Sequence, residues 1–227
     1  MAGLNAARLS KGLDAMELGR DAAYIGVMID DLVTKEIIEP YRLFTSRAEY
    51  RLFLRQDNAD MRLCETAYKN GLLSYPKYEK FKEYKKLCEN AEELSKKTKY
   101  EGVAISVLLK KFKGVFSGKS QIPFPPGILN LNMDELRDRR IMNQLVINAH
   151  YEGYLKREQL SIAKLVKLEE WRIPASYSYE GISGLSNESR AKLTKVAPST
   201  LAQAARIDGV TPSEIALLQV HLSRRGR

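Results

Sequence analysis

The sequence predicts an all-α protein: a helical domain that ends in a cluster of three short helices. Three observations carry this prediction. Apolar residues recur at three- and four-residue steps, very few stretches alternate between apolar and polar residues, and side chains typical of helix starts precede the apolar runs. With 227 residues, 44% of them hydrophobic, the chain can bury a sizeable core.

Two short helices are expected near the N-terminus. One covers Gly3–Ser10 and the other covers Ala22–Thr34. The apolar positions of the second helix at helical spacing are Ile25, Ile29, Leu32 and Val33. Asp30 and Asp31 are adjacent in it, so their carboxylates are expected to point away from each other.

The run from Glu39 to Leu63 carries five arginines between apolar and aromatic residues. Ser46 and Glu49 have the spacing of a capping box, which predicts a helix from there to Gln56. Arginines recur on it at every fourth position, as one cationic stripe, at Arg47, Arg51 and Arg55. The stripe is either a solvated face that pairs with nearby carboxylates or a phosphate-facing surface, because guanidinium forks match phosphate oxygens.

The middle of the chain is expected to hold longer helices. Asp57 is a candidate N-cap for a helix that runs to Asn70, where Gly71 ends it. Pro76 opens a strongly charged helix whose lysines are interpreted as a solvated back. Its packing seam consists of Tyr78, Phe81, Tyr84, Leu87 or Cys88, Ala91 and Leu94.

A further helix is expected over Val103–Phe112, before a region rich in proline and glycine. That region, residues 114–132, is the best candidate for a mobile loop. Its GKS triplet, residues 118–120, lacks the first glycine of a phosphate-binding loop and is interpreted as a chance match. One long helix over Arg140–Trp171 follows.

The C-terminal part is expected to fold as three short helices. Their caps are Ser186 for the first, Ser199 or Thr200 for the second, and Thr211 with Pro212 for the third. The second and third helices resemble a DNA-binding helix-turn-helix, so a DNA-binding regulator is the alternative function. The third helix, however, presents Glu214 and apolar residues at its start, which favours packing over the reading of bases.

The composition indicates which class of partner the protein binds, but it does not indicate a reaction that the protein catalyses. The net charge of +9 favours a polyanionic partner. Cys64 and Cys88 lack metal-ligand spacing, and the isolated His150 and His221 are interpreted as structural, so no metal is expected. No apolar run is long enough to span a bilayer and no secretory signal is present, so a cytoplasmic location is expected. The sequence lacks GxSxG, HExxH and a GxGxxG after a strand, so no catalytic residue is assigned.

Five ordered segments nevertheless resemble one protein family. They are AYIGVMIDDLVT, EPYRLFTSRAEYRLFLRQDNADMRL, HYEGYLKRE, GLSNE and ARIDGVTPSEIALLQVHL. Together they are similar to the C-terminal part of the FAD-dependent subunit of the tRNA uridine 5-carboxymethylaminomethyl modification enzyme, the GidA/MnmG family. Small departures from the family pattern occur at Leu43, Cys64 and His150.

The resemblance implies that the chain is a C-terminal fragment without the α/β flavin domain, and that it is inactive alone. It implies FAD and NADH as cofactors of the full-length protein, with none bound by this fragment, and a full-length homodimer. It also implies that this region docks tRNA and a GTPase partner. The segments expected are residues 1–20 as a remnant of the flavin domain, 21–136 as a helical subdomain, 137–182 as long helix and linker, and 183–227 as the short-helix cluster.

Site residues follow from charge and exposure within this frame. The candidate tRNA contacts are Arg47, Arg51, Arg55, Lys192, Lys195, Arg206, Arg224 and Arg225. The candidate contacts to the GTPase are Asn187 and Glu188. The arginines of the stripe have a competing role, which is to brace the junction with the flavin domain. A purely structural bundle that supports a dimer is a third candidate function.

Overall fold

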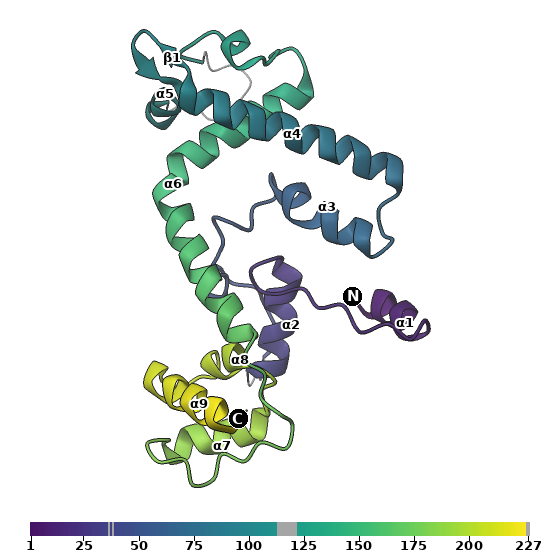
Figure 1. The fold of residues 1–227 in the computed structure, drawn as a ribbon, viewed down its shortest axis with the longest axis vertical. Coiled ribbons are helices and arrows are strands. Elements are labelled where there is room, and N and C mark those ends of the chain that lie inside the picture. The colour runs from purple at the N-terminus through teal and green to yellow at the C-terminus, as the bar shows by residue number, and fades with distance from the viewer. Residues whose placement is uncertain (36, 38, 113–121, 226–227) are drawn as a thin grey trace. The chain divides into compact units, whose positions relative to one another are not determined.

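The computed structural model describes residues 1–35, 37, 39–112 and 122–225. Across these residues the regular secondary structure is helical apart from one antiparallel pair of two-residue strands, so the all-α prediction is confirmed (Figure 1). The chain divides into two compact units. Unit 1 consists of Met1–Arg51 and Glu158–Arg227, and unit 2 consists of Leu52–Arg157.

Unit 2 is built around one hydrophobic core. Its elements are α3 (Ala59–Lys69), α4 (Tyr75–Lys97), β1 (Lys99–Tyr100), β2 (Val103–Ala104), α5 (Ile105–Lys111), the 3-10 helix η2 (Pro126–Leu129) and the part of α6 (Leu136–Glu169) that ends at Arg157. The core joins α4, α5, the η2 segment and α6 through buried side chains that include Ala91, Leu109, Leu129 and Ile141. Cys88, not Leu87, occupies the packing seam of α4.

Helices α3 and α4 begin and end close to their predicted positions. Asn70 is the C-cap of α3, and Gly71 follows with a φ of +71°, a conformation that glycine adopts at little cost. The amide of Leu72 donates to the carbonyl of Ala67 and that of Gly71 to Tyr68, which is the Schellman pattern. The N-cap of α3 is Asn58, so the prediction of Asp57 was wrong.

The long helix α6 begins four residues before the predicted Arg140 and ends at Glu169. Its first turns are anchored in the core of unit 2, through buried residues from Asp138 to Val146. The helix predicted over Val103–Phe112 began two residues too early, because Val103 and Ala104 pair with β1 and α5 starts at Ile105. The GKS triplet and residues 114–121 of the predicted mobile loop lie outside the described residues, and the rest of that loop contains η2 and packs Phe124, Leu129 and Leu131 into the core of unit 2.

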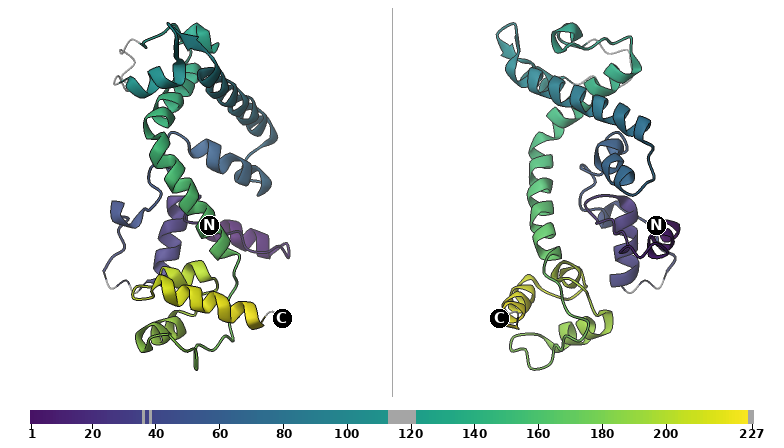
Figure 2. Two further views of the ribbon diagram at one scale, coloured as in Figure 1. Left: turned by 60° about the vertical axis from the view of Figure 1, so that its left-hand side comes forward. Right: turned by 45° about the vertical axis from the view of Figure 1, so that its right-hand side comes forward.

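Unit 1 contains α1 (Ala2–Leu9), α2 (Tyr24–Thr34), the 3-10 helix η1 (Thr45–Arg47) and the end of α6. It closes with α7 (Asn187–Val196), α8 (Leu201–Ala205) and α9 (Pro212–Arg225), the three short helices that the sequence predicts (Figure 2). Their core centres on Leu193, Leu201 and Leu218, which are fully buried. Leu168, in the last turn of α6, and Trp171, just after the helix ends, pack against this core.

The caps of the three short helices form as predicted. Ser186 Oγ accepts from the Ser189 amide at 3.1 Å, and Thr200 Oγ1 accepts from the Gln203 amide at 3.1 Å. At α9, the Thr211 amide donates to Glu214 Oε2 at 2.8 Å, and the Glu214 amide lies 3.4 Å from Thr211 Oγ1. These reciprocal contacts are those of a capping box.

The predicted arginine helix is absent from the described residues. After the single turn of η1, residues 48–58 form turns and bends, so the capping box at Ser46 and Glu49 was wrong. Without a helix, the four-residue spacing of Arg47, Arg51 and Arg55 places them on no common face. Arg47 and Arg51 belong to unit 1 and Arg55 belongs to unit 2.

Candidate nucleic-acid interface

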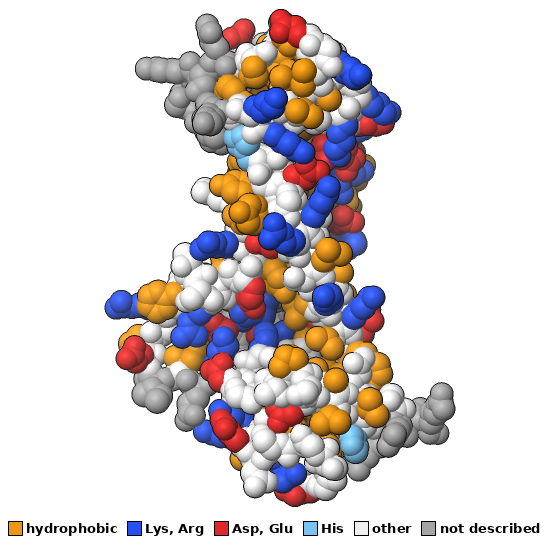
Figure 3. Space-filling model, turned by 90° about the vertical axis from the view of Figure 1, so that its left-hand side faces the viewer, with side chains coloured by type: hydrophobic (Ala, Val, Ile, Leu, Met, Phe, Trp, Pro, Cys, Tyr) orange, Lys and Arg blue, Asp and Glu red, His pale blue; other side chains and the backbone are white. Residues whose placement is uncertain are grey.

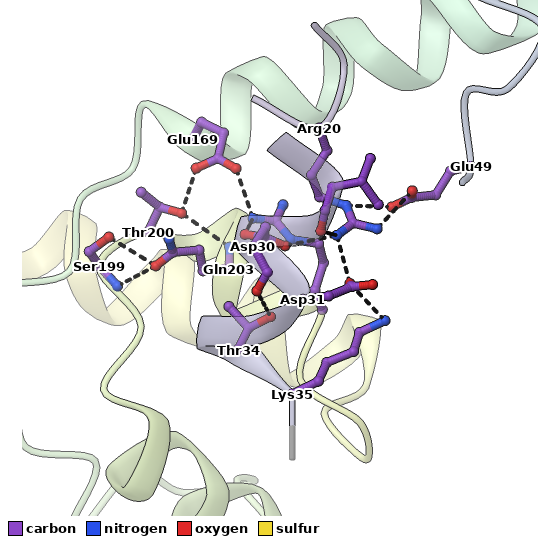
Figure 4. Close-up of polar contacts among 12 residues, drawn as sticks. Arg20, Asp30, Asp31, Thr34, Lys35, Glu49, Glu169, Ser199, Thr200 and Gln203 are labelled. Carbon is purple, nitrogen blue, oxygen red and sulfur yellow. Dashed lines mark hydrogen bonds and ion pairs between the residues drawn. The ribbon is translucent and has the colours of Figure 1, made fainter. Parts of the chain in front are cut away.

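Arg20 lies at the centre of a buried group of charges in unit 1 (Figure 4). Its guanidinium donates to both oxygens of Glu49, each at 2.9 Å. It also donates to Asp31 Oδ1 at 2.7 Å and to Asp30 Oδ2 at 3.1 Å, so one nitrogen binds both of the carboxylates that were expected to diverge. Its two backbone acceptors are the carbonyls of Val27 and Arg47. The Arg20 side chain is 3% exposed.

Asp31 is the fully buried anion of this group. Besides Arg20, it accepts a hydrogen bond from Tyr41 Oη at 3.0 Å and lies 3.3 Å from Lys35 Nζ and 3.5 Å from Arg47 Nη1. Burial by itself would raise the pKa of Asp31, but the hydrogen bonds and positive charges outweigh it and hold the pKa below its ordinary value. We call Arg20, Asp30, Asp31, Tyr41, Arg47 and Glu49 the Arg20 cluster.

The Arg20 cluster fixes the segment that carries the arginines. Tyr41 is tied to Asp31 by its hydroxyl, Arg47 by its carbonyl to Arg20, and Glu49 by its carboxylate to Arg20. The guanidinium of Arg47 also lies over the Tyr41 ring, 5.4 Å from its centroid. The segment therefore has a defined conformation without being helical.

Arg206 links α2 to the C-terminal helices. Its Nη2 donates to Asp30 Oδ1 at 2.6 Å and to Glu169 Oε1 at 3.1 Å, and its side chain is 12% exposed. Glu169 accepts in turn from Thr200 Oγ1 at 2.7 Å (Figure 4). A phosphate contact through Arg206 would have to displace two carboxylates, so its position in the structure is that of an internal ion pair.

The other predicted tRNA contacts differ in how far they are already engaged. Arg51 is exposed, and the described residues offer it no hydrogen bond or ion pair. Arg55 is mostly buried in unit 2, where it binds Asp57 at 3.0 Å and the Leu52 carbonyl at 2.8 Å. Lys195 is exposed on α7. Arg224 and Arg225 end α9, and their side chains lie outside the described part of the chain.

The predicted partner contacts lie on the first turn of α7. Asn187 accepts a hydrogen bond from Arg190 at 3.0 Å, and the exposed Glu188 pairs with Lys192 at 2.7 Å. Lys192 also donates to the carbonyl of Asp208 at 2.7 Å. This turn is therefore an exposed surface of mixed charge, ordered by its own hydrogen bonds.

Glu214 is a structural residue of α9. It is 5% exposed and accepts from the amides of Thr211 and Ser186, at 2.8 Å and 3.0 Å. These hydrogen bonds lower its pKa to about 2, against the opposing effect of burial. Ile215 and Leu218 are buried in the core beside it, so the start of this helix packs rather than reads bases. The DNA-binding alternative finds no support here.

Charge is mixed on the one face of the molecule that Figure 3 draws. On this face, Lys and Arg side chains are spread out with acidic side chains between them. Among the described residues no cluster of three or more histidine, cysteine or acidic side chains could hold a metal ion. None of the described helices is long and apolar enough to cross a membrane.

A dinucleotide such as FAD is held by a glycine-rich turn between a strand and a helix of a parallel sheet. The strands in the described residues are β1 and β2, which are antiparallel and two residues long each. The residues that the structure describes therefore do not fit a flavin, and we assign them no cofactor contact.

Comparison with known proteins shows which proteins this helical chain is similar to. Residues 161–227 match the model of the tRNA modifying enzyme MnmG/GidA C-terminal helical bundle. The chain is 42% identical to the tRNA uridine 5-carboxymethylaminomethyl modification enzyme MnmG of Caldicellulosiruptor saccharolyticus, over 99% of this chain and 38% of that protein. It is 40% identical to the MnmG of Ligilactobacillus salivarius, over 99% of this chain and 37% of that protein. The chain belongs to the MnmG/GidA family.

The solved structures agree with this assignment. The GidA of Aquifex aeolicus, in its form II crystal, matches with a TM-score of 0.75 and 39% identity, over 97% of this chain and 36% of that one. Its form I crystal matches with a TM-score of 0.74. The chain thus spans less than two fifths of the length of these MnmG/GidA relatives.

Sequence reasoning missed the residue at the centre of the site. Arg20 lies outside the arginine-rich run and has no periodic partner, so its charge alone did not distinguish it. The available signal was the pair Asp30–Asp31 on an otherwise apolar helix, because buried carboxylates require a cation. It identified the need for a partner but not which of 37 Lys and Arg residues supplies it.

Proposed function

We propose that this chain is the tRNA- and GTPase-docking region of an MnmG-type enzyme, which adds a carboxymethylaminomethyl-type group to the wobble uridine of tRNA. One observation carries the proposal: the match at about 40% identity across 99% of the chain to proteins named for that modification. The net charge of +9 supports a polyanionic partner. Reaction chemistry, with FAD and NADH, is proposed for the part of the family protein that this chain does not span.

The proposed tRNA contacts are the residues chosen from the sequence. The structure ranks them by their exposure and by the groups that they already bind. Arg51 and Lys195 are exposed, whereas Arg47 is half-buried, with one face of its guanidinium toward Tyr41 and its Nη1 3.5 Å from the buried Asp31. Arg55, Arg206 and Lys192 already bind carboxylates or carbonyls, so their contribution to phosphate binding would be smaller. The residue ranked first is therefore Arg51, which is exposed and has no hydrogen bond or ion pair among the described residues.

The proposed GTPase contact is the first turn of α7, at Asn187 and Glu188. Both side chains are exposed, and the turn is held rigid by the Ser186 cap. A rigid, exposed polar turn loses little conformational freedom when a partner binds, which supports this surface over a flexible one. A cytoplasmic location and a homodimer of the whole protein are part of the same proposal.

The test measures the affinity of this chain for tRNA over a range of salt concentrations. Arg51→Ala should weaken binding and flatten the slope of log K against log salt by about one unit, because one phosphate contact is lost. The matched control is Arg137→Ala, an exposed arginine that pairs with Glu135 and Asp138 in unit 2. Equal slopes for wild type and Arg51→Ala would reject the phosphate role.

A second arm measures capture of the purified GTPase. Glu188→Ala should reduce capture while the circular dichroism spectrum stays unchanged, because Glu188 is exposed and pairs only locally with Lys192. Lys156→Ala, which breaks a comparable exposed pair with Glu152 on α6, serves as control. Retained capture by Glu188→Ala with wild-type folding rejects this surface.

A further inference from the structure

A turn in unit 1 presents an uncovered aromatic ring among arginines. Phe44 is 55% exposed and its neighbour Leu43 is 42% exposed. Arg42, Thr45 and Ser46 around them are exposed as well. We call residues 42–47 the Phe44 turn.

The backbone of the Phe44 turn is closed by its own hydrogen bonds. The Phe44 amide donates to the Arg42 carbonyl at 3.1 Å, and the Arg47 amide donates to the Phe44 carbonyl at 3.0 Å. These two bonds tie the backbone positions of both arginines directly to the residue that bears the ring. The arrangement places cationic side chains on both sides of Phe44 along the chain.

The Phe44 turn is also anchored at both ends by buried contacts. Tyr41 precedes it and donates to the buried Asp31, and Arg20 binds the carbonyl of Arg47 at its end. Ala48 and Tyr50, which follow, are buried. The exposed turn lies between these anchors, so the ring is presented on a fixed base and its exposure is not that of a frayed end.

Two properties together indicate the chemistry of its partner. An exposed aromatic ring offers a flat face on which a base can stack, and an exposed arginine beside it offers charge to the phosphates of the same strand. Exposed hydroxyls at Thr45 and Ser46 add hydrogen-bonding groups beside the ring. Such stacking requires an unpaired base, because the face of a base inside a duplex is covered by its neighbours.

We propose that Phe44 stacks on an unpaired RNA base, with the exposed Arg42 on an adjoining phosphate. The proposal rests on the proposed function, since it names the part of the tRNA that unit 1 would contact. A protein surface is the competing occupant, but apolar packing against protein gives no role to the exposed cation of Arg42 beside the ring. The exposed ring and this cation together favour RNA.

The experiment compares two RNA probes: a stem-loop with an unpaired loop, and a blunt duplex with the same number of phosphates. Phe44→Leu keeps the apolar volume but removes the ring, so stem-loop affinity should fall about tenfold, within the range measured for loss of one stacked base. Affinity for the duplex should not change. Phe44→Trp, which keeps an aromatic face, should bind the stem-loop at least as tightly as wild type.

A matched control is available on α6. Tyr154 is 56% exposed, but the guanidinium of Arg157 already covers its ring, 5.2 Å from the centroid. Tyr154→Leu should therefore leave stem-loop affinity unchanged. Circular dichroism checks that each variant folds, and the exposure of Phe44 makes a folding defect in Phe44→Leu unexpected.

The outcomes separate the two proposals. Wild-type binding to the stem-loop with equal affinity in Phe44→Leu overturns the stacking role alone, and leaves Leu43 and Phe44 as an apolar contact for protein. Equal affinity of wild type for both probes also overturns it. Binding of neither probe by wild type rejects the proposed function itself.

Discussion

Two segments of this chain share the capping-box pattern, a hydroxyl residue with glutamate three positions on, yet only one of them begins a helix. Thr211 and Glu214 exchange contacts at the start of α9. Ser46 and Glu49 do not, and the chain there forms a 3-10 turn followed by bends. Local sequence is nearly equivalent in the two places, so the difference must come from the surroundings.

The surroundings differ in what competes for the glutamate. Glu49 gives both of its oxygens to the buried guanidinium of Arg20, whereas Glu214 meets only amides and hydroxyls. A charge-assisted bidentate pair is stronger than a bond to a backbone amide, and Arg20 would be a costly buried cation without it. A capping box contributes about 1 kcal/mol and loses this competition.

Removal of Arg20, which competes with the helix start for Glu49, should have the largest effect on the free energy of unfolding. Arg20→Met leaves Asp31 buried with its principal partner gone, which should lower the free energy of unfolding of unit 1 by about 3–5 kcal/mol. Urea unfolding followed by the fluorescence of Trp171, the single tryptophan, measures it within unit 1. Arg51→Met, at an exposed position of the same unit, should change it by less than about 0.5 kcal/mol. Equal losses of unfolding free energy in Arg20→Met and Arg51→Met would show that the ion pair with Arg20 does not hold Glu49.

The glutamate that does cap should show its role as a dependence on pH. The folded pKa of Glu214 is about 2, below the ordinary 4.5, so its stabilisation is complete above about pH 5 and is lost as the pH falls toward 2. Glu214→Gln should cost about 2 kcal/mol at neutral pH, since the charged acceptor of three hydrogen bonds is lost. The difference in unfolding free energy between Glu214→Gln and wild type should become smaller as the pH falls from about 5 to about 2. A difference in unfolding free energy between wild type and Glu214→Gln that stays constant over this pH range would contradict the capping role of the Glu214 carboxylate.

The smallest effect on the free energy of unfolding is expected when the two hydroxyl residues, Thr211 and Ser46, are each replaced. Thr211→Ala should lower the free energy of unfolding by about 1 kcal/mol, because it removes the cap of α9. Ser46→Ala should leave it unchanged to within about 0.5 kcal/mol, since Ser46 is exposed and caps no helix. Thermal unfolding followed by circular dichroism measures both, and a cost for Ser46→Ala equal to that of Thr211→Ala would restore the predicted capping box.

Predictions from the sequence succeeded where one local pattern had no competitor. The packing seam of α4, the end of α3 at Gly71 and the three caps at Ser186, Thr200 and Thr211 follow from spacing and side-chain chemistry within a few residues. The arginine stripe failed because its helix depended on a glutamate whose partner, Arg20, is 29 residues away. The site residues, the domain limits and the docking roles stay predictions.

The sequence by itself determined that the chain is helical, how most of its helices begin and end, and the MnmG/GidA family. These depend on periodicity, on caps and on ordered motifs, all of which are local. Only the tertiary structure decided what the arginines do, because a guanidinium binds whichever carboxylate the fold brings within about 3 Å. It buried Arg20 and Arg206 among carboxylates and left Arg42, Phe44 and Arg51 exposed.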